Sequence, residues 1–231
     1  MTYVKASVRR PAGNPGNGIQ PKDQLVIYDV DDILSFPPRN DAGVVIEEDI
    51  VMKAGRYAIG IYLTPGTAEI SSNSDGETDA EGYTPSIKFN HPGNEQEIRE
   101  FKTNWLSKKC IVVLRYCSGK PADLIGTPCN PCKLSVSYTG SNESNTNELT
   151  FTQISKGDDI AIYRGTDTLE EPVAVVEAGA TDIDYQTDGQ YQLSAGAAKI
   201  AGVTGGSHGS VITLMGCSGV APTVEDRKSV V

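Results

Sequence analysis

One stretch of helical periodicity lies inside a chain that otherwise reads as short strands and turns. Asn94 is followed three residues later by Glu97, a pair typical of the capped N-terminus of a helix. Beyond this pair, apolar residues recur at three- and four-residue intervals, at Ile98, Phe101, Trp105 and Leu106. We therefore predict a single helix, at about 94–107, whose apolar stripe packs on a sheet.

Composition indicates the class of fold around that helix. The chain has 231 residues, of which 38% are hydrophobic, so it is long enough to bury a sizeable core. Its 24 Gly and 13 Pro indicate many turns between short strands. We predict a mainly β fold, a β-sandwich or barrel with one packed α-helix. Changes in composition divide the chain into an N-terminal arm (1–22), a β domain (23–170) and a small C-terminal β unit with a flexible tail (171–231).

The strand-like segments around the helix follow a definite order. A strand-like run ending at Phe89 precedes the helix, and an apolar run, 109–117, follows it. An Ile-Gly-Thr-Pro turn then leads into two strand-like segments, 133–139 and 147–154, which flank a Ser/Asn-rich tip, and the tract ends in Tyr-Arg-Gly at 163–165. From about Tyr57 onward, this order resembles the tail tube (major tail) proteins of long-tailed bacteriophages.

The resemblance implies a β-sandwich or barrel of the tail-tube type and a role as a virion structural protein. Copies of the chain would form rings, expected to be hexameric, that stack into the channel for genome ejection. The implied partners are further copies of the chain and other tail proteins, such as the tape measure, the terminator and a sheath. DNA would be only a non-specific cargo of the lumen. The implied localisation is the virion tail, assembled in the host cytoplasm.

An acidic, polar stretch precedes the helix. Residues 70–82 contain no apolar side chain after Ile70 except that of Ala80. Such a segment cannot bury enough surface to order itself, so we predict a long loop. The resemblance implies that this loop contacts a neighbouring subunit or ring, and a solvated loop without a partner is the alternative. The candidate contact residues are Ser72, Asp75, Glu77, Asp79 and Glu81.

The formal net charge of −10 argues against a protein that grips nucleic acid, because affinity for phosphate comes mainly from Lys and Arg. An acidic surface suits a conduit, since a duplex is repelled from a negatively charged wall. The same charge is equally compatible with a role in solubility alone.

Five cysteines, an odd number, fit a reducing compartment better than a disulfide framework. Cys129 and Cys132 have the spacing of a redox pair or of half a zinc site, but they run into a strand-like segment and not into a helix. Cys110 and Cys117 lack the short spacing of a zinc knuckle. We predict buried free thiols.

No constellation of catalytic residues can be assembled from the sequence. The chain has two histidines, and neither is accompanied by the signature of a nucleophile. We therefore expect no enzymatic activity, no cofactor and no metal ligand. No stretch approaches the roughly 20 apolar residues of a membrane helix, so a membrane partner is not expected either.

Two other functions remain open at this level. A tail terminator or head–tail connector protein can resemble a tube subunit. A surface adhesion or glycan-binding module would also fit the tandem β units, although one Trp and 6% aromatic residues offer little material for a sugar platform.

Overall fold

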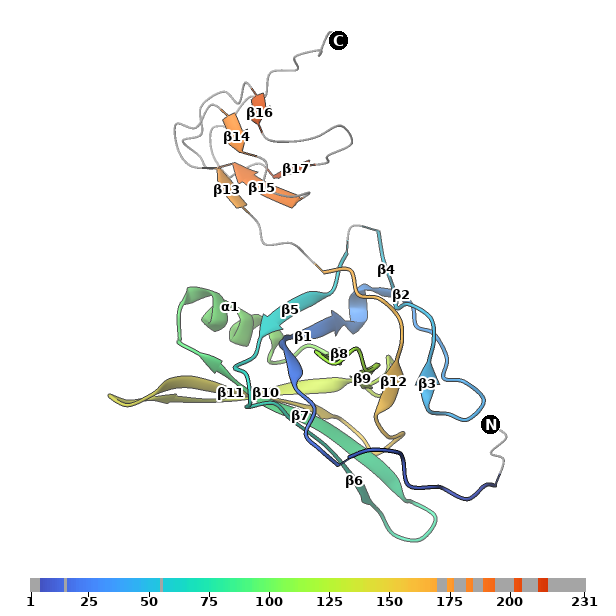
Figure 1. Ribbon diagram of the computed structural model, residues 1–231. Coiled ribbons are helices and arrows are strands. Elements are labelled where there is room, and N and C mark those ends of the chain that lie inside the picture. Colours follow the sequence, from blue (N-terminus) through green and yellow to red (C-terminus); the bar gives the residue numbers. More distant parts are fainter. Residues whose placement is uncertain are drawn as a thin grey trace. The chain divides into compact units, whose positions relative to one another are not determined.

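The computed structural model describes residues 5–14, 16–54 and 56–169, together with five short strands between 174 and 215. The chain divides into two compact units, 1–170 and 171–231, which are described separately here. The described residues form a mainly β fold with one α-helix, which confirms the predicted fold class (Figure 1).

A central sheet forms the middle of the first unit. Strand β1 pairs with β5 on one side and β8 on the other, and β8, β9, β12 and β3 continue the sheet. All neighbours are antiparallel except β12 and β3. The strands are β1 (Pro21–Asp29), β3 (Val45–Ile46), β5 (Ile59–Tyr62), β8 (Cys110–Tyr116), β9 (Ala122–Ile125) and β12 (Ala161–Tyr163).

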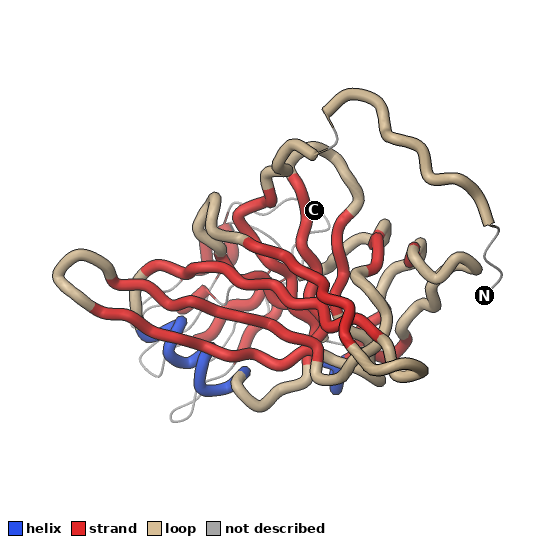
Figure 2. The backbone as a smooth tube through the Cα atoms, turned by 90° about the horizontal axis from the view of Figure 1, so that it is seen from below, coloured by secondary structure: helices blue, strands red, loops and turns tan. Residues whose placement is uncertain are grey.

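A second group of strands, which we call the hairpin sheet, consists of two long antiparallel hairpins side by side (Figure 2). It joins the central sheet where Cys132 pairs with Cys110, the one register pair between β10 and β8 in the described part of the chain. Its strands, in spatial order, are β10 (Cys132–Gly140), β11 (Asn145–Gln153), β7 (Gly82–Pro92) and β6 (Glu69–Asp75).

The first core cluster lies where the two sheets and the helix meet. Leu25 and Ile27 of β1 belong to it, together with Phe89 and Phe151 of the hairpin sheet, whose rings stack with centroids 6.3 Å apart. Alternate residues of a strand face one side, so each hairpin strand contributes every second residue to this core.

A second core cluster covers the opposite face of the central sheet. Val26 and Tyr28 of β1 and Val113 of β8 pack there against the segment that follows β1. Because β1 and β8 are buried on both faces, their sequences are continuous apolar runs without alternation. The covering segment contains the 3-10 helix η1 (Val30–Asp32) and the paired strands β2 (Ile33–Ser35) and β4 (Val51–Met52).

The helix α1 (Gln96–Trp105) is shorter than the predicted 94–107, and its predicted cap is wrong. The N-cap residue is Glu95, which makes no side-chain cap hydrogen bond. Asn94 Oδ1 accepts a hydrogen bond from Lys102 Nζ at 2.9 Å, so this oxygen is used elsewhere. The helix therefore begins without the expected Asn94–Glu97 box.

The prediction of a long loop at 70–82 is also wrong. Residues up to Asp75 form β6, which pairs with β7 over seven register positions, and a turn of residues 76–81 remains. An edge strand needs apolar residues on one face at most, and it gains its backbone hydrogen bonds from a single neighbour. The polar sequence is therefore compatible with a strand once β7 is in place.

The ends of the chain differ in their described content. Residues 5–14 and 16–20 contain no helix or strand and are exposed, and β1 begins at Pro21, inside the segment predicted as the arm. In the second unit, β13 (Ala174–Val176), β15 (Gly189–Leu193) and β17 (Ile212–Met215) form one parallel sheet. The strands β14 (Asp182–Asp184) and β16 (Gly202–Thr204) form another. The predicted flexible tail lies outside the described residues.

Candidate assembly interface

The hairpin sheet has a free edge on each side among the described residues. β6 pairs with β7 alone, and β10 pairs with β11 along its length but with β8 at Cys132 alone. Residues 133–140 of β10 and 69–75 of β6 therefore present unpaired backbone groups. Because each of the three strand contacts in this sheet is antiparallel, β10 and β6 run in opposite directions. An edge β6 can thus continue the same antiparallel pattern with an edge β10 from another copy.

One face of the hairpin sheet is polar along its whole extent. In one row across the sheet, Ser135, Thr150, Lys88 and Glu69 lie in register, and Lys88 and Glu69 form an ion pair at 3.3 Å. No described residue of the two large core clusters lies on this face. Its further residues, all exposed or half-buried, are Lys133, Ser137, Glu148, Thr152, Ser86, Asn90, Ser71 and Asn73. The sheet thus separates a core from a hydroxyl-rich surface.

The five predicted contact residues divide between a strand and a turn. Ser72 and Asp75 lie on β6, whereas Glu77, Asp79 and Glu81 lie in the turn 76–81 and are exposed. The turn residues form no ion pair or hydrogen bond through their side chains with any described residue. The structure therefore brings them together at one tip, where their negative charges stay unneutralised.

The segment after β11 supports the base of this tip. Gly157 forms an isolated antiparallel bridge with Tyr83, and Lys156 pairs with Asp75 at 3.1 Å. Ser72 Oγ donates a hydrogen bond to Asp159 Oδ1 at 2.5 Å. The hydrogen bond and ion pair with Lys156 lower the pKa of Asp75. The hairpin is thus held at its base, and the turn beyond it projects.

The helix stripe is confirmed in part. Ile98 is buried, and Phe101 and Trp105 pack on the first core cluster with their rings stacked at 5.7 Å. Leu106 is 54% exposed, so its inclusion in the stripe was wrong, because it lies just beyond the last helical residue. The helix braces the core face of the hairpin sheet through Lys102, whose Nζ donates to Asn147 Oδ1 of β11 at 2.6 Å.

Sequence reasoning missed a buried polar cluster on the opposite side of the central sheet. Asp167 accepts a hydrogen bond from Tyr28 Oη at 2.5 Å and pairs with Arg115, whose guanidinium also donates to Gly165 O at 2.7 Å. Burial and the hydrogen bond to Asp167 raise the pKa of Tyr28 far above its ordinary value. The cluster fastens residues 164–169 to the sheet, and no local motif could have revealed it because its members are distant in sequence.

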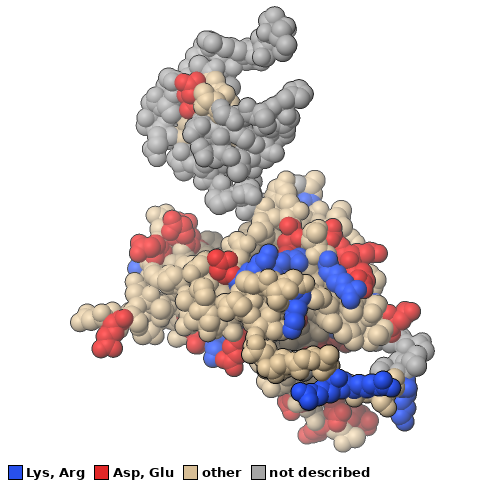
Figure 3. All heavy atoms as spheres, in the orientation of Figure 1, with Lys and Arg blue, Asp and Glu red and all other residues tan. Residues whose placement is uncertain are grey.

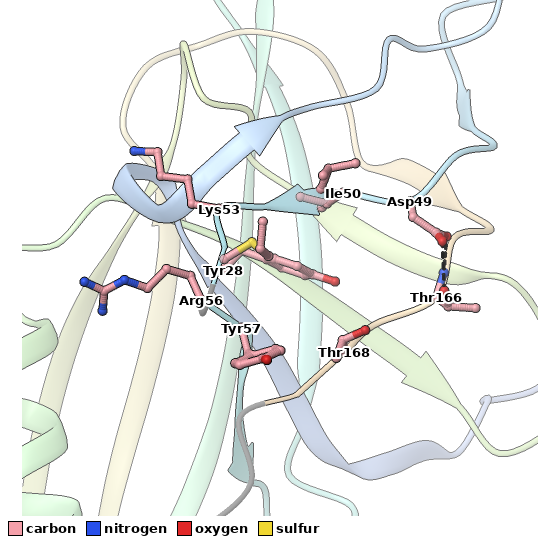
Figure 4. Close-up of a pocket in the computed structure, with 10 residues that line it drawn as sticks. Tyr28, Asp49, Ile50, Lys53, Arg56, Tyr57, Thr166 and Thr168 are labelled. Atoms are coloured by element: carbon pink, nitrogen blue, oxygen red, sulfur yellow. Dashed lines mark hydrogen bonds between the residues drawn. The ribbon is translucent and has the colours of Figure 1, made fainter. Parts of the chain in front are cut away.

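A cavity of about 350 Å³ adjoins this cluster (Figure 4). Tyr28 lies at its centre, and Asp49 accepts a hydrogen bond from the Thr166 backbone at 2.7 Å at one side. Lys53 and Arg56 point away from the centre, and both are engaged with the η1 segment. The cavity therefore offers no free cation to a ligand.

The four described cysteines are free thiols, as predicted, but the prediction that they are buried holds for two of them only. Cys110 and Cys132 are buried opposite each other, whereas Cys117 and Cys129 are exposed. Burial raises the pKa of Cys110 to about 12. In the described part of the chain, no three potential ligand residues gather into a metal site, and no helix there is long and apolar enough to cross a membrane.

Comparison of the chain with protein-family models, with curated proteins and with solved structures gives no match in any of the three cases.

Proposed function

We propose that this chain is a virion structural protein, the tail tube subunit of a long-tailed bacteriophage, whose copies form hexameric rings that stack into the channel for genome ejection. The observation that carries the proposal is the hairpin sheet, which combines two free edges of opposite direction with one polar face. Edge-to-edge pairing of copies removes both edges and turns the four-stranded sheets into one closed wall.

A wall of six copies would be wide enough to enclose a channel. Barrels of about eight strands are filled by their own side chains, and those of about 16–18 strands hold an aqueous channel. Six copies bring about 24 strands, which at about 4.8 Å per strand give a circumference of about 115 Å and a backbone diameter of about 37 Å. Two copies leave no passage, whereas six leave a wide one.

The charge of the polar face supports a conduit for DNA. Its charged residues are two lysines, two glutamates and Asp75 among Ser, Thr and Asn side chains, so the face does not attract phosphate. DNA affinity depends on the number of phosphates that cations neutralise, and this face offers few unpaired cations. In the proposed tube this face lines the lumen, and the helix and central sheet form the outer body.

The tip at 76–81 supplies a contact between rings in this proposal, and the tape measure, terminator and a sheath are further partners in the virion tail. The rings assemble from the subunit in the host cytoplasm.

Negative-stain microscopy of the purified protein tests the proposal. Rings or hollow fibres of uniform width are expected, and a compact monomer at every concentration would overturn the proposal in favour of an adhesion module.

A pair of proline variants sharpens the test. Successive N–H groups of a strand point to opposite sides, so of Ser137→Pro and Tyr138→Pro one removes a donor from the free edge of β10 and the other a bond to β11. Both residues are exposed. The edge variant should stay folded by circular dichroism but form no rings, whereas the other variant should be measurably less stable, because it loses a ladder hydrogen bond to β11. Rings formed by both variants would show that β10 is not the joining edge.

A further inference from the structure

The N-terminal arm is basic in an acidic protein. Residues 1–22 contain Lys5, Arg9, Arg10 and Lys22 but no Asp or Glu, although the whole chain carries a net charge of −10. The described arm residues 5–14 and 16–20 are exposed, and Val8 reaches 96% exposure. Lys5, Arg9 and Arg10 form no ion pair with any described residue. The arm therefore presents apolar and cationic groups that its own subunit leaves unused.

A groove of about 490 Å³ lies on the body of the same unit. Its apolar walls come from Phe36, Pro37 and Pro38 on one side and from Pro128 on the other. The exposed Cys129 lies at its lip. The described arm residues, 5–14 and 16–20, contribute none of the lining residues, so this part of the arm does not fill the groove of its own chain.

The floor of the groove holds a partly satisfied cation. Arg39 donates to Gly43 O at 3.0 Å and to Asp159 O at 2.6 Å, which fixes its guanidinium in place. Its Nε is buried without a hydrogen-bond partner and lies 3.9 Å from Asp158 Oδ2. Because this Nε is enclosed, a group entering the groove does not reach it, and Arg39 holds the loop of residues 39–43 on the segment that carries Asp159.

The rim of the groove is acidic. Asp158 is 63% exposed at its side chain, and Asp41 is exposed in the loop that carries Arg39. Asp159 connects this rim to β6 through Ser72, and the acidic tip at 76–81 follows on the same hairpin. Figure 3 shows the contrast on one face, with basic side chains over the arm and acidic side chains over the β6–β7 end.

We propose that residues Val8–Pro11 of one copy dock into this groove on a second copy. Val8 and Pro11 fill the proline-lined walls, and Arg9 and Arg10 reach the carboxylates of Asp158 and Asp41. The 13 residues from Val8 to the start of β1 span at most about 45 Å when extended, which is enough to cross a subunit boundary. The inference rests on the proposed assembly of copies, for which it names a joining contact.

Disulfide trapping between two differently tagged full-length chains tests the docking. One chain carries Val8→Cys together with Cys129→Ser, and the other keeps its natural Cys129. After mild oxidation, a mixed disulfide between position 8 and Cys129 is expected on a non-reducing gel, with the linked peptides identified by mass spectrometry. Because the two thiols belong to different chains, an arm folded back on its own groove cannot produce this product.

Charge variants provide the matched control. Asp158→Lys in the receiving chain should lower the yield of the disulfide about tenfold or more, because like charges then meet at the rim. Glu143→Lys, the same change at the exposed β10–β11 turn, should leave the yield unchanged. Equal yields from both variants, or linkage mainly to the exposed Cys117, would overturn the proposal.

Two further outcomes separate this inference from the proposed function. Rings without the mixed disulfide would refute arm docking but remain compatible with the proposed tube. The mixed disulfide without rings would support arm docking and refute the tube. Retention of duplex DNA that is lost on Arg9→Ser and Arg10→Ser substitution, in the absence of the disulfide, would assign the arm to nucleic acid and overturn the docking.

Discussion

Replacing Ile98 by Ala tests how the single helix is attached. Ile98 is 4% exposed and lies in the first core cluster, so the substitution removes three buried carbon groups. At about 0.8 kcal/mol for each group the transfer loss is about 2.4 kcal/mol, and the incompletely filled cavity raises the total to about 3 kcal/mol. The matched control is Leu106→Ala, because Leu106 is 54% exposed and should cost less than about 0.5 kcal/mol.

Urea unfolding followed by tryptophan fluorescence measures both effects. Trp105 is the chain's one tryptophan and lies in the first unit, so its signal reports that unit and not the C-terminal one. The free energies of unfolding are compared between variants that share the same slope of free energy against urea concentration, because a changed slope would indicate a changed unfolded state. A loss below about 1 kcal/mol for Ile98→Ala, or an equal loss for Leu106→Ala, would refute the packing assigned to the helix.

Three further results are expected. Cys117 and Cys129 should react with a thiol reagent in the native protein, whereas Cys110 and Cys132 should react only on unfolding. Rapid labelling of all four would contradict the burial of Cys110 and Cys132. A chelator should release no zinc from the protein. The free energy of unfolding should fall as pH rises from about 9 to about 12. The Cys110 thiol ionises near its ordinary pKa in the unfolded chain, whereas burial raises its pKa to about 12 in the folded protein. Melting curves recorded at alkaline pH measure this loss. Asp167→Ala should cost about 2–3 kcal/mol, because the half-buried Arg115 and the Tyr28 hydroxyl lose their shared acceptor. Breaking the exposed ion pair at the β6–β7 hairpin should cost less than about 1 kcal/mol, and calorimetry distinguishes the two.

The elements that the sequence predicted well are those whose pattern has only one interpretation. The three- and four-residue spacing of Ile98, Phe101 and Trp105 is incompatible with a strand, so the helix and its buried face were predictable. The cap was not, because Asn94 has two possible partners and Lys102 provides one of them only after the helix has folded. The local sequence does not show which of these two partners the Asn94 side chain takes.

The edge strand and the groove were beyond local reasoning for a different reason. β6 is polar apart from Ile70, which packs on the first core cluster. The strand also depends on β7 and on Asp159, which lies 87 residues away from Ser72 in the sequence. The groove is assembled from the 36–43 loop, the 127–129 turn and Asp158. None of these three segments carries a sequence pattern that indicates the others. Only the folded structure shows that they form one groove.

The connectivity of the two sheets has a consequence for the order of folding. The hairpin sheet consists of two local hairpins closed by the turns at 76–81 and 141–144, whereas β1 in the central sheet must find β8 more than 80 residues later. Short loops close faster and at a lower entropic cost than long ones. The two hairpins, with the free edges of β6 and β10, are therefore expected to form before the central sheet is complete. A nascent chain would then expose unpaired strand edges at a stage when its core is not yet finished.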